Sequence, residues 1–278
     1  MPFQQTIQPE NKFFDLRLKE IWRYRDLLML FVRRDFVAKY KQTILGPLWL
    51  FIRPLFQTLT MVVVFERMAK LSTEGVPPIL FYLAGTTAWN YFANCLTTTS
   101  NTFTANAYIF GKVYFPRVIT PLSVIISNLI QFGIGFMLFV SIYIYFFVQG
   151  GTVAPNKALL LLPLLIVNMG FMGLGLGMLI SASTTKYRDL QNLVSFGVQL
   201  LMYASPVIIP LSSVPEKYMP VMLWNPMTGV IETFRYAFLG SGTFSFKLVA
   251  YSTGFTIFIF FVGLLVFNKT EKNFMDTV

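Results

Sequence analysis

The chain has 278 residues and a formal net charge of +10. Hydrophobic residues make up 55% of it and charged residues only 12%, against roughly 25% charged in soluble domains. Cys95 is the only cysteine and histidine is absent, which excludes an intrachain disulfide and a zinc site of cysteine and histidine ligands. Because a soluble fold of this size could not bury so much apolar surface, the composition predicts an integral membrane protein.

The first 43 residues are predicted to precede the membrane domain. Their charged start, with Glu10, Lys12 and Asp15, lacks the apolar core of a signal peptide. In residues 13–41, apolar side chains recur at four-residue spacing and basic side chains crowd the remaining surface. This pattern favours an amphipathic helix in the membrane interface, with its basic face toward anionic headgroups.

Residues 44–278 are expected to form one all-α membrane domain. A helix needs about 20 apolar residues to cross a hydrocarbon core of about 30 Å. Six runs meet this need approximately, at residues 44–66, 79–104, 118–148, 158–183, 190–209 and 248–267. The stretches between residues 211 and 240 are too short to cross and are interpreted as two re-entrant helices.

In the fourth run, small residues recur on one helix face. Gly173, Gly177 and Ser181 are spaced four residues apart. We interpret this stripe as a surface for close helix packing rather than a dimer seam.

The distribution of basic residues predicts the orientation of the chain. Six spans place both termini on one side of the membrane, and that side holds most of the lysines and arginines. The positive-inside rule therefore predicts cytoplasmic termini. The positive net charge is explained by this topology, so it does not indicate nucleic-acid binding.

The spans contain no obvious source of energy for transport. Their middles hold no carboxylate of the kind that ion-coupled carriers use, since Glu66 and Asp189 lie at span ends and Glu232 lies in the re-entrant region. The sequence has no phosphate-binding loop and no acid-base or nucleophilic set typical of an enzyme. An active transporter of this kind would need a partner chain that supplies the energy.

Four stretches carry a family resemblance. They are RYRDLLMLFVRRDFVAKYKQTILGPLW (23–49), NAYIFGKVYFPRVITPL (106–122), YASPVIIPLSSVPEKYMPVMLWNPMTGVIETFRYAFLG (203–240) and TEKNFMDTV (270–278). In order and spacing they resemble the permease subunit of polysaccharide ABC exporters of the ABC-2 type, in the O-antigen (Wzm-like) family. Capsule and teichoic-acid export permeases are relatives of that family.

The resemblance implies a homodimeric channel in the bacterial inner membrane that moves a lipid-linked polysaccharide of the undecaprenyl pyrophosphate type, O-antigen first among the candidates. It implies two copies of a separate ABC ATPase subunit, which would hold ATP and Mg, so this chain itself would be no enzyme and bind no cofactor. Residues 24–41 resemble a gate helix, 106–117 the coupling helix that docks on the ATPase, and 211–240 the re-entrant helices at the exit.

Aromatic side chains are candidates for a surface along which sugars slide, because the C–H faces of sugars stack on aromatic rings. The candidates are Tyr203, Trp49, Phe56, Tyr91, Trp89 and Trp224. The alternative is that these rings face lipid, pack between helices or form interfacial belts.

Two basic sets are candidates for binding the cargo and the ATPase. The candidates for binding the lipid pyrophosphate at the access gate are Arg33, Arg34, Lys39, Lys41 and Arg53. The alternative is that these side chains make ordinary contacts with lipid headgroups. Arg53 also departs from the resemblance, which implies an uncharged residue before the proline. The candidates for ATPase coupling are Lys112, Tyr114, Pro116 and Arg117. The alternative is that they belong to an ordinary cytoplasmic loop whose positive charge reflects only the topology.

Two other functions stay open from the sequence. One is an ATP-independent lipid scramblase or membrane assembly factor. The other is a type-2 ABC exporter of small lipids or drugs. A partner ATPase encoded among glycosyltransferases would favour the polysaccharide exporter over both.

Overall fold

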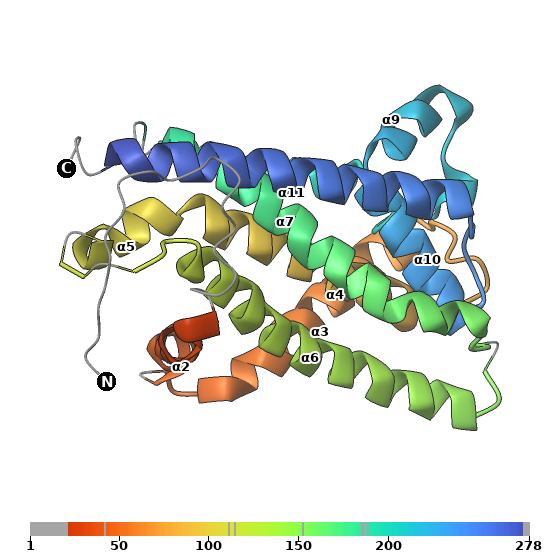
Figure 1. Ribbon diagram of the computed structural model, residues 1–278. Helices are drawn as coiled ribbons and strands as arrows, with labels where there is room; N and C mark the ends of the chain where they lie inside the picture. Colours follow the sequence, from red (N-terminus) through yellow and green to blue (C-terminus); the bar gives the residue numbers. More distant parts are fainter. Residues whose placement is uncertain are drawn as a thin grey trace.

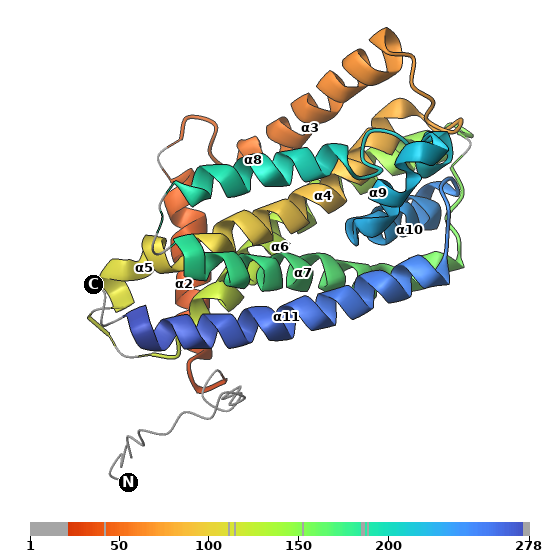
Figure 2. The ribbon, with the colours of Figure 1, turned by 90° about the horizontal axis from the view of Figure 1, so that it is seen from above.

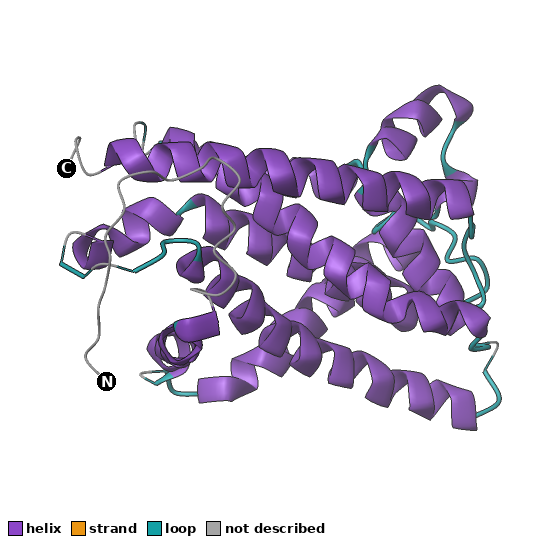
Figure 3. Cartoon of the chain, viewed as in Figure 1, coloured by secondary structure: helices purple, strands orange, loops and turns teal. Residues whose placement is uncertain are grey.

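The computed structural model describes residues 22–274, apart from residues 42, 111, 114, 152, 185, 186 and 188. Within these residues the regular secondary structure is helical and contains no strand (Figure 3). The predicted all-α fold class is therefore confirmed.

The helices form a bundle with two distinct ends. The first part of the chain contains α2 (Arg25–Tyr40), a short turn (Gly46–Leu48), α3 (Trp49–Met61), a π-helical segment (Val62–Met68), α4 (Pro78–Ser100), α5 (Thr102–Phe110) and α6 (Ile119–Val148). After the turn Lys157–Leu161 come α7 (Leu162–Thr184), α8 (Leu190–Tyr203), the turns Leu211–Ser213 and Glu216–Tyr218, α9 (Met219–Trp224), α10 (Met227–Leu239) and α11 (Phe246–Phe274). Helices α2 and α5 lie at one end and α9 and α10 at the other (Figure 1).

Within the described part of the chain, four helical segments are long and apolar enough to cross a membrane. They are Gly46–Met68, Ile119–Val148, Lys157–Thr184 and Phe246–Thr270. They match the predicted first, third, fourth and sixth spans. The helices in the predicted spans 79–104 and 190–209 do not combine the length and the hydropathy of a membrane span, for two different physical reasons.

The first exception, α4, has the length of a span but carries many polar residues. It packs against both α6 and α7, and most of its residues are buried. A helix surrounded by protein needs no continuous lipid-compatible surface, so its hydroxyl and amide groups are tolerated there. The helix stops at Ser100, and α5 continues the chain as a separate short helix.

The second exception, α8, has 14 residues. Its length of about 21 Å is less than a hydrocarbon core. The chain leaves the helix after Tyr203 and runs irregularly past Pro206 and Pro210. A proline disfavours helical backbone in the residue before it, which accounts for the early end.

Residues 211–240 contain two short α-helices, α9 with six residues and α10 with 13. Nearly every residue of α10 is buried. Within residues 106–117, predicted as a coupling helix, α5 ends at Phe110, and the described residues from there to Pro116 are not helical.

The small-residue stripe lets α7 approach α4 closely. A Cβ added to Gly173 would lie 2.7 Å from the Phe92 carbonyl oxygen, and one added to Gly177 would lie 2.5 Å from the Thr99 Cβ. Beyond the glycines, the Thr184 hydroxyl donates to the Ser100 carbonyl at 2.6 Å. The packing interpretation is therefore confirmed for the two glycines.

A buried ion pair ties α10 to three other segments. The Arg235 side chain donates to the carbonyls of Pro206 and Val207, which follow α8, and lies 3.6 Å from the centroid of the Phe81 ring in α4. Glu232 lies 3.7 Å from Arg235 and accepts hydrogen bonds from the backbone and hydroxyl of Thr243. Because both charges are fully buried, removal of either would leave the other uncompensated.

The helix contact predicts a contrast between two glycines. Gly177→Val should lower the free energy of unfolding by about 1–3 kcal/mol, because the added carbons meet α4. Gly133→Ala should leave it unchanged or raise it slightly, since nothing lies within 4 Å of a Cβ there. Unfolding of the purified variants in detergent measures both, and equal effects of the two substitutions would contradict the packing assignment.

Candidate functional site

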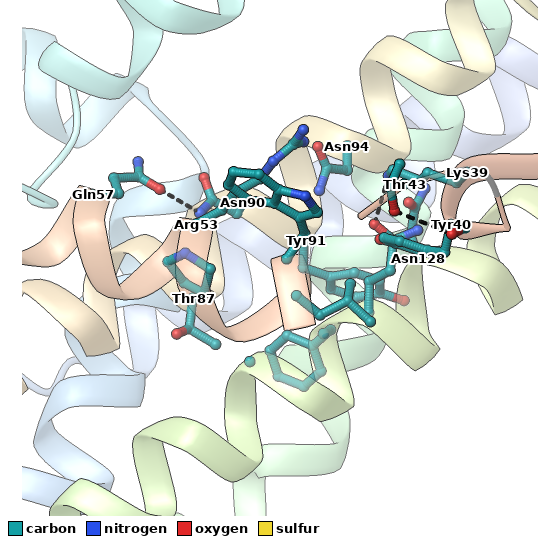
Figure 4. A pocket seen from close by; sticks show the side chains of 16 residues that line it. Lys39, Tyr40, Thr43, Arg53, Gln57, Thr87, Asn90, Tyr91, Asn94 and Asn128 are labelled. Carbon is teal, nitrogen blue, oxygen red and sulfur yellow. Dashed lines mark hydrogen bonds between the residues drawn. The ribbon is translucent and has the colours of Figure 1, made fainter. Parts of the chain in front are cut away.

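A polar cavity lies between α2, α3, α4 and α6, and its volume is about 340 Å³ (Figure 4). Its lining combines two cations, five carboxamides, aromatic rings and threonine hydroxyls. The lining residues are Lys39, Tyr40, Thr43, Trp49, Leu50, Arg53, Pro54, Gln57, Thr87, Asn90, Tyr91, Asn94, Asn128, Gln131, Phe132 and Gly135.

Two positive charges face this cavity. Lys39 Nζ donates to Gln131 Oε1 at 2.8 Å, and Arg53 Cζ lies 5.6 Å from the centroid of the Trp49 ring. Surrounding protein atoms lower the pKa of Lys39 below its usual value by desolvation, and the charge of Arg53 lowers it further. None of the described lining residues is a carboxylate. An anion is therefore the ligand that would relieve the repulsion between the two cations.

The carboxamides give the cavity a neutral polar wall. Asn90 Nδ2 donates to Gln57 Oε1 at 2.9 Å, which joins α4 to α3. The polar side chains of α4 that face the cavity, Thr87, Asn90 and Asn94, follow a three- and four-residue spacing, so they lie on one helix face. Such groups both donate and accept hydrogen bonds and suit an uncharged hydroxylated ligand.

The aromatic lining comes from four helices, with Tyr40 contributed by α2. Trp49 belongs to α3, Tyr91 to α4 and Phe132 to α6, and the rings of Tyr91 and Phe132 lie 5.0 Å apart. A Cβ added to Gly170 of α7 would lie 2.6 Å from the Tyr91 hydroxyl oxygen. Tyr91 therefore forms a fixed wall of the cavity, with its hydroxyl directed into the bundle.

Only two of the five basic gate candidates reach the cavity, namely Lys39 and Arg53. Arg33 and Lys41 are exposed outside its lining. Arg34 Nε donates to Asp35 at 2.8 Å, and its guanidinium lies 4.6 Å from the centroid of the Phe31 ring. A further hydrogen bond runs from its Nη2 to Asn106 Oδ1 of α5 at 3.2 Å, so Arg34 is engaged with its own helix and with α5.

The aromatic candidates are dispersed as well. Trp49 and Tyr91 line the cavity, whereas Phe56, Tyr203 and Trp224 are 65%, 53% and 81% exposed on other parts of the surface. Trp89 is buried, with its ring 5.3 Å from that of Phe92. The six rings therefore form no single row within one protomer.

The coupling candidates occupy different environments. Lys112 is exposed at the end of the bundle that holds α5, and Pro116 is half-buried. Arg117 is buried, and its Cζ lies 5.2 Å from the centroid of the Phe110 ring. Tyr114 lies outside the described residues. Of the described residues in this set, Lys112 is the one whose charge faces outward.

A polar stripe on α8 is a feature that the sequence reasoning missed. On α8, Asn192, Ser195 and Gln199 are exposed at three- and four-residue spacing, in line with Tyr203. On α3, Arg53 is exposed one turn before the half-buried Gln57. Helices α3 and α8 lie toward the same side of the bundle (Figure 2). The helical spacing of the polar residues on α8 was the signal that could have found them.

Comparisons with known proteins relate the sequence to one family of transporters. The family model of the ABC-2 type transporter matches residues 26–239. The O-antigen export system permease protein RfbA of Klebsiella pneumoniae is 28% identical over 252 residues, which cover 90% of this chain and 94% of the relative. The protein of the same name from Myxococcus xanthus is 26% identical, covering 80% of this chain and 83% of its own length.

A capsule-type relative is also similar. The polysialic acid transport protein KpsM of Escherichia coli is 21% identical over 242 residues, which cover 86% of this chain and 91% of the relative. The family match spans most of the chain, including α2, the cavity and the short helices α9 and α10. The chain belongs to the ABC-2 type transporter family.

Proposed function

We propose that this chain is the membrane subunit of an ATP-driven exporter of a lipid-linked polysaccharide in the bacterial inner membrane, with O-antigen as the first candidate cargo. The observation that carries the proposal is the exposed polar stripe of α8, at Asn192, Ser195 and Gln199. Polar side chains are costly against lipid and are expected to face a water-filled path. The names of the similar permeases support a polysaccharide as the cargo of that path.

A second copy of the chain would close this path. Helices α3 and α8 expose apolar as well as polar residues on one side of the bundle, among them Phe56, Leu193 and Phe196. In a homodimer the apolar residues would contact the partner while the polar stripe of α8 lines the channel between the two copies. Tyr203, which continues the stripe of α8, would then face the glycan.

Six spans complete this arrangement. Helix α4 would be the second span, shielded from lipid by its neighbours, and α8 with the irregular residues that follow it would be the fifth. Both termini would be cytoplasmic, by the positive-inside rule. The bundle end with α2 and α5 would face the cytoplasm, and α9 and α10 would lie at the exit.

The cavity would receive the lipid pyrophosphate. Lys39 and Arg53 supply two cations without a lining carboxylate, and pyrophosphate forms strong charge-assisted hydrogen bonds with such groups. The position of Lys39 on α2 supports the assignment of this helix as an access gate. ATP and Mg would be bound by two copies of the partner ATPase.

The channel assignment is tested by a matched pair of serines. Ser195 of α8 and Ser141 of α6 are both exposed, and each hydroxyl donates to the carbonyl one turn before it. Ser195→Leu should reduce ATP-dependent glycan export severalfold, because it places an apolar side chain in the water-filled path. Ser141→Leu should leave export unchanged, since Ser141 would face lipid. Equal export by the two variants in reconstituted vesicles would contradict the channel.

Binding of undecaprenyl pyrophosphate to the purified permease tests the anion site. Lys39→Gln and Arg53→Gln should each weaken this binding at least about tenfold, because each substitution removes a charge-assisted hydrogen bond. Lys41→Gln is the control, because Lys41 is exposed outside the cavity. If all three variants bind as the parent does, or if phosphatidylglycerol binds as tightly as the pyrophosphate, the site is an ordinary headgroup contact.

The lowered pKa of Lys39 adds a pH dependence to this binding. Since an anion favours the charged ammonium, affinity should fall as the pH rises, starting below the range in which an ordinary lysine loses its proton. Burial raises the pKa of Tyr40, the titratable neighbour on α2, so it stays neutral there. The pH dependence should disappear in Lys39→Gln, and a profile shared by the parent and this variant would exclude Lys39 as its source.

The cytoplasmic end of the bundle would dock on the ATPase. Lys112→Glu should reduce copurification of the ATPase and the ATPase activity that depends on this chain. Lys217→Glu is the control, because Lys217 is exposed beside α9 at the opposite end. An undiminished complex with the Lys112 variant, or an equal loss with both, would contradict the assignment.

A further inference from the structure

Arg53 lies beside the amide pair of the cavity, whereas Lys39 lies at the opposite end (Figure 4). In Figure 4, Gln57 and Asn90 lie toward one end of the cavity, Lys39 and Tyr40 lie toward the other, and Asn94 lies between them. An anion bound to Arg53 would therefore lie next to Asn90 and Gln57. A ligand held there would extend its next group toward the amides.

The amide pair offers hydrogen bonds to such a group. The bond from Asn90 to Gln57 uses one N–H of Asn90 and the oxygen of Gln57. It leaves the oxygen of Asn90 and the amino group of Gln57, an acceptor and a donor on adjacent helices. This combination matches a hydroxyl group, which both donates and accepts.

Thr87 is an independent sign that the wall binds something. Its side chain lines the cavity and is only 7% exposed, yet its hydroxyl has no hydrogen-bond partner in the described protein. The adjacent Thr86 is also buried, but its hydroxyl donates to the Tyr82 carbonyl at 2.9 Å. A buried hydroxyl without a partner costs about 1–3 kcal/mol, a cost that a hydroxylated ligand in the cavity would remove.

The size and composition of the cavity fit one ligand class. Its volume of about 340 Å³ lies in the range of small-molecule sites, roughly 300–1,000 Å³. The cations require an anion, the amides and Thr87 require neutral hydroxyls beside it, and Trp49 offers a ring face at the same site. A sugar attached to a phosphate or pyrophosphate has these features in this order.

We propose that Thr87, Asn90 and Gln57 bind the sugar nearest to the pyrophosphate, so that the permease reads this first sugar as well as the anion. This inference rests on the proposed function, which supplies the lipid pyrophosphate. It adds a specificity site within each protomer, separate from the channel between protomers. The rest of the polymer would not be bound at this site.

Two lipid probes and two isosteric variants test the inference. The probes are undecaprenyl pyrophosphate and the same lipid carrying one N-acetylglucosamine, each titrated into the purified permease. Thr87→Val and Asn90→Leu should each weaken binding of the sugar-bearing probe about three- to tenfold, because each removes one neutral hydrogen bond. Binding of the sugarless probe should stay unchanged. Thr86→Val is the matched control and should change neither. Thr87→Ser retains the hydroxyl and should bind both probes as the parent does.

The outcomes separate this inference from the proposed function. If Thr87→Val and Asn90→Leu bind both probes as the parent does, or weaken both equally, while Lys39→Gln weakens both, the sugar site is overturned and the anion site stands. If Lys39→Gln and Arg53→Gln also leave both probes unaffected, the anion site of the proposed function fails too. Tighter binding of phosphatidylglycerol than of the sugar-bearing probe would assign the amide wall to the glycerol of a phospholipid and overturn the inference.

Discussion

The close approach of α4 and α7 is the contact on which the rest of the structure depends. Gly173 and Gly177 leave no room for a side chain between the two backbones, and Gly175 faces α11 on another side of α7 in the same way. In lipid, helices associate through such close contact and through buried hydrogen bonds rather than by expelling water. Because α4 is held at the centre, its polar face can border the cavity with α2, α3 and α6 without contacting lipid.

The same constraint determines where charge is tolerated. Arg235 and Glu232 are fully buried, but they neutralise each other and bind the backbone on both sides of α10. Lys39 and Arg53 have no such carboxylate in their cavity. The first pair therefore stabilises the position of a short helix, whereas the second pair remains available to an anionic ligand. This difference separates a structural charge cluster from the candidate site.

Much of the fold follows from hydropathy alone, because four long apolar runs must each become a helix in lipid. The separation of α4 from α5 and the early end of α8 depend on backbone geometry near Asn101 and Pro206, which hydropathy does not report. Among the site residues, charge pointed to Lys39 and Arg53, but it also selected Arg34 and Arg117, whose guanidinium groups lie against the rings of Phe31 and Phe110. The amide wall was missed because neutral side chains give no signal until the fold brings α3, α4 and α6 together.

The central claim is that this chain moves a lipid-linked polysaccharide with the energy of a partner ATPase. The most direct test is isolation of the native complex from its membrane, followed by mass spectrometry of its proteins and bound lipids. The account predicts an ABC ATPase in equal amount and a polyprenyl pyrophosphate that carries a glycan. A purified chain that holds only phospholipid and has no ATPase partner would contradict it.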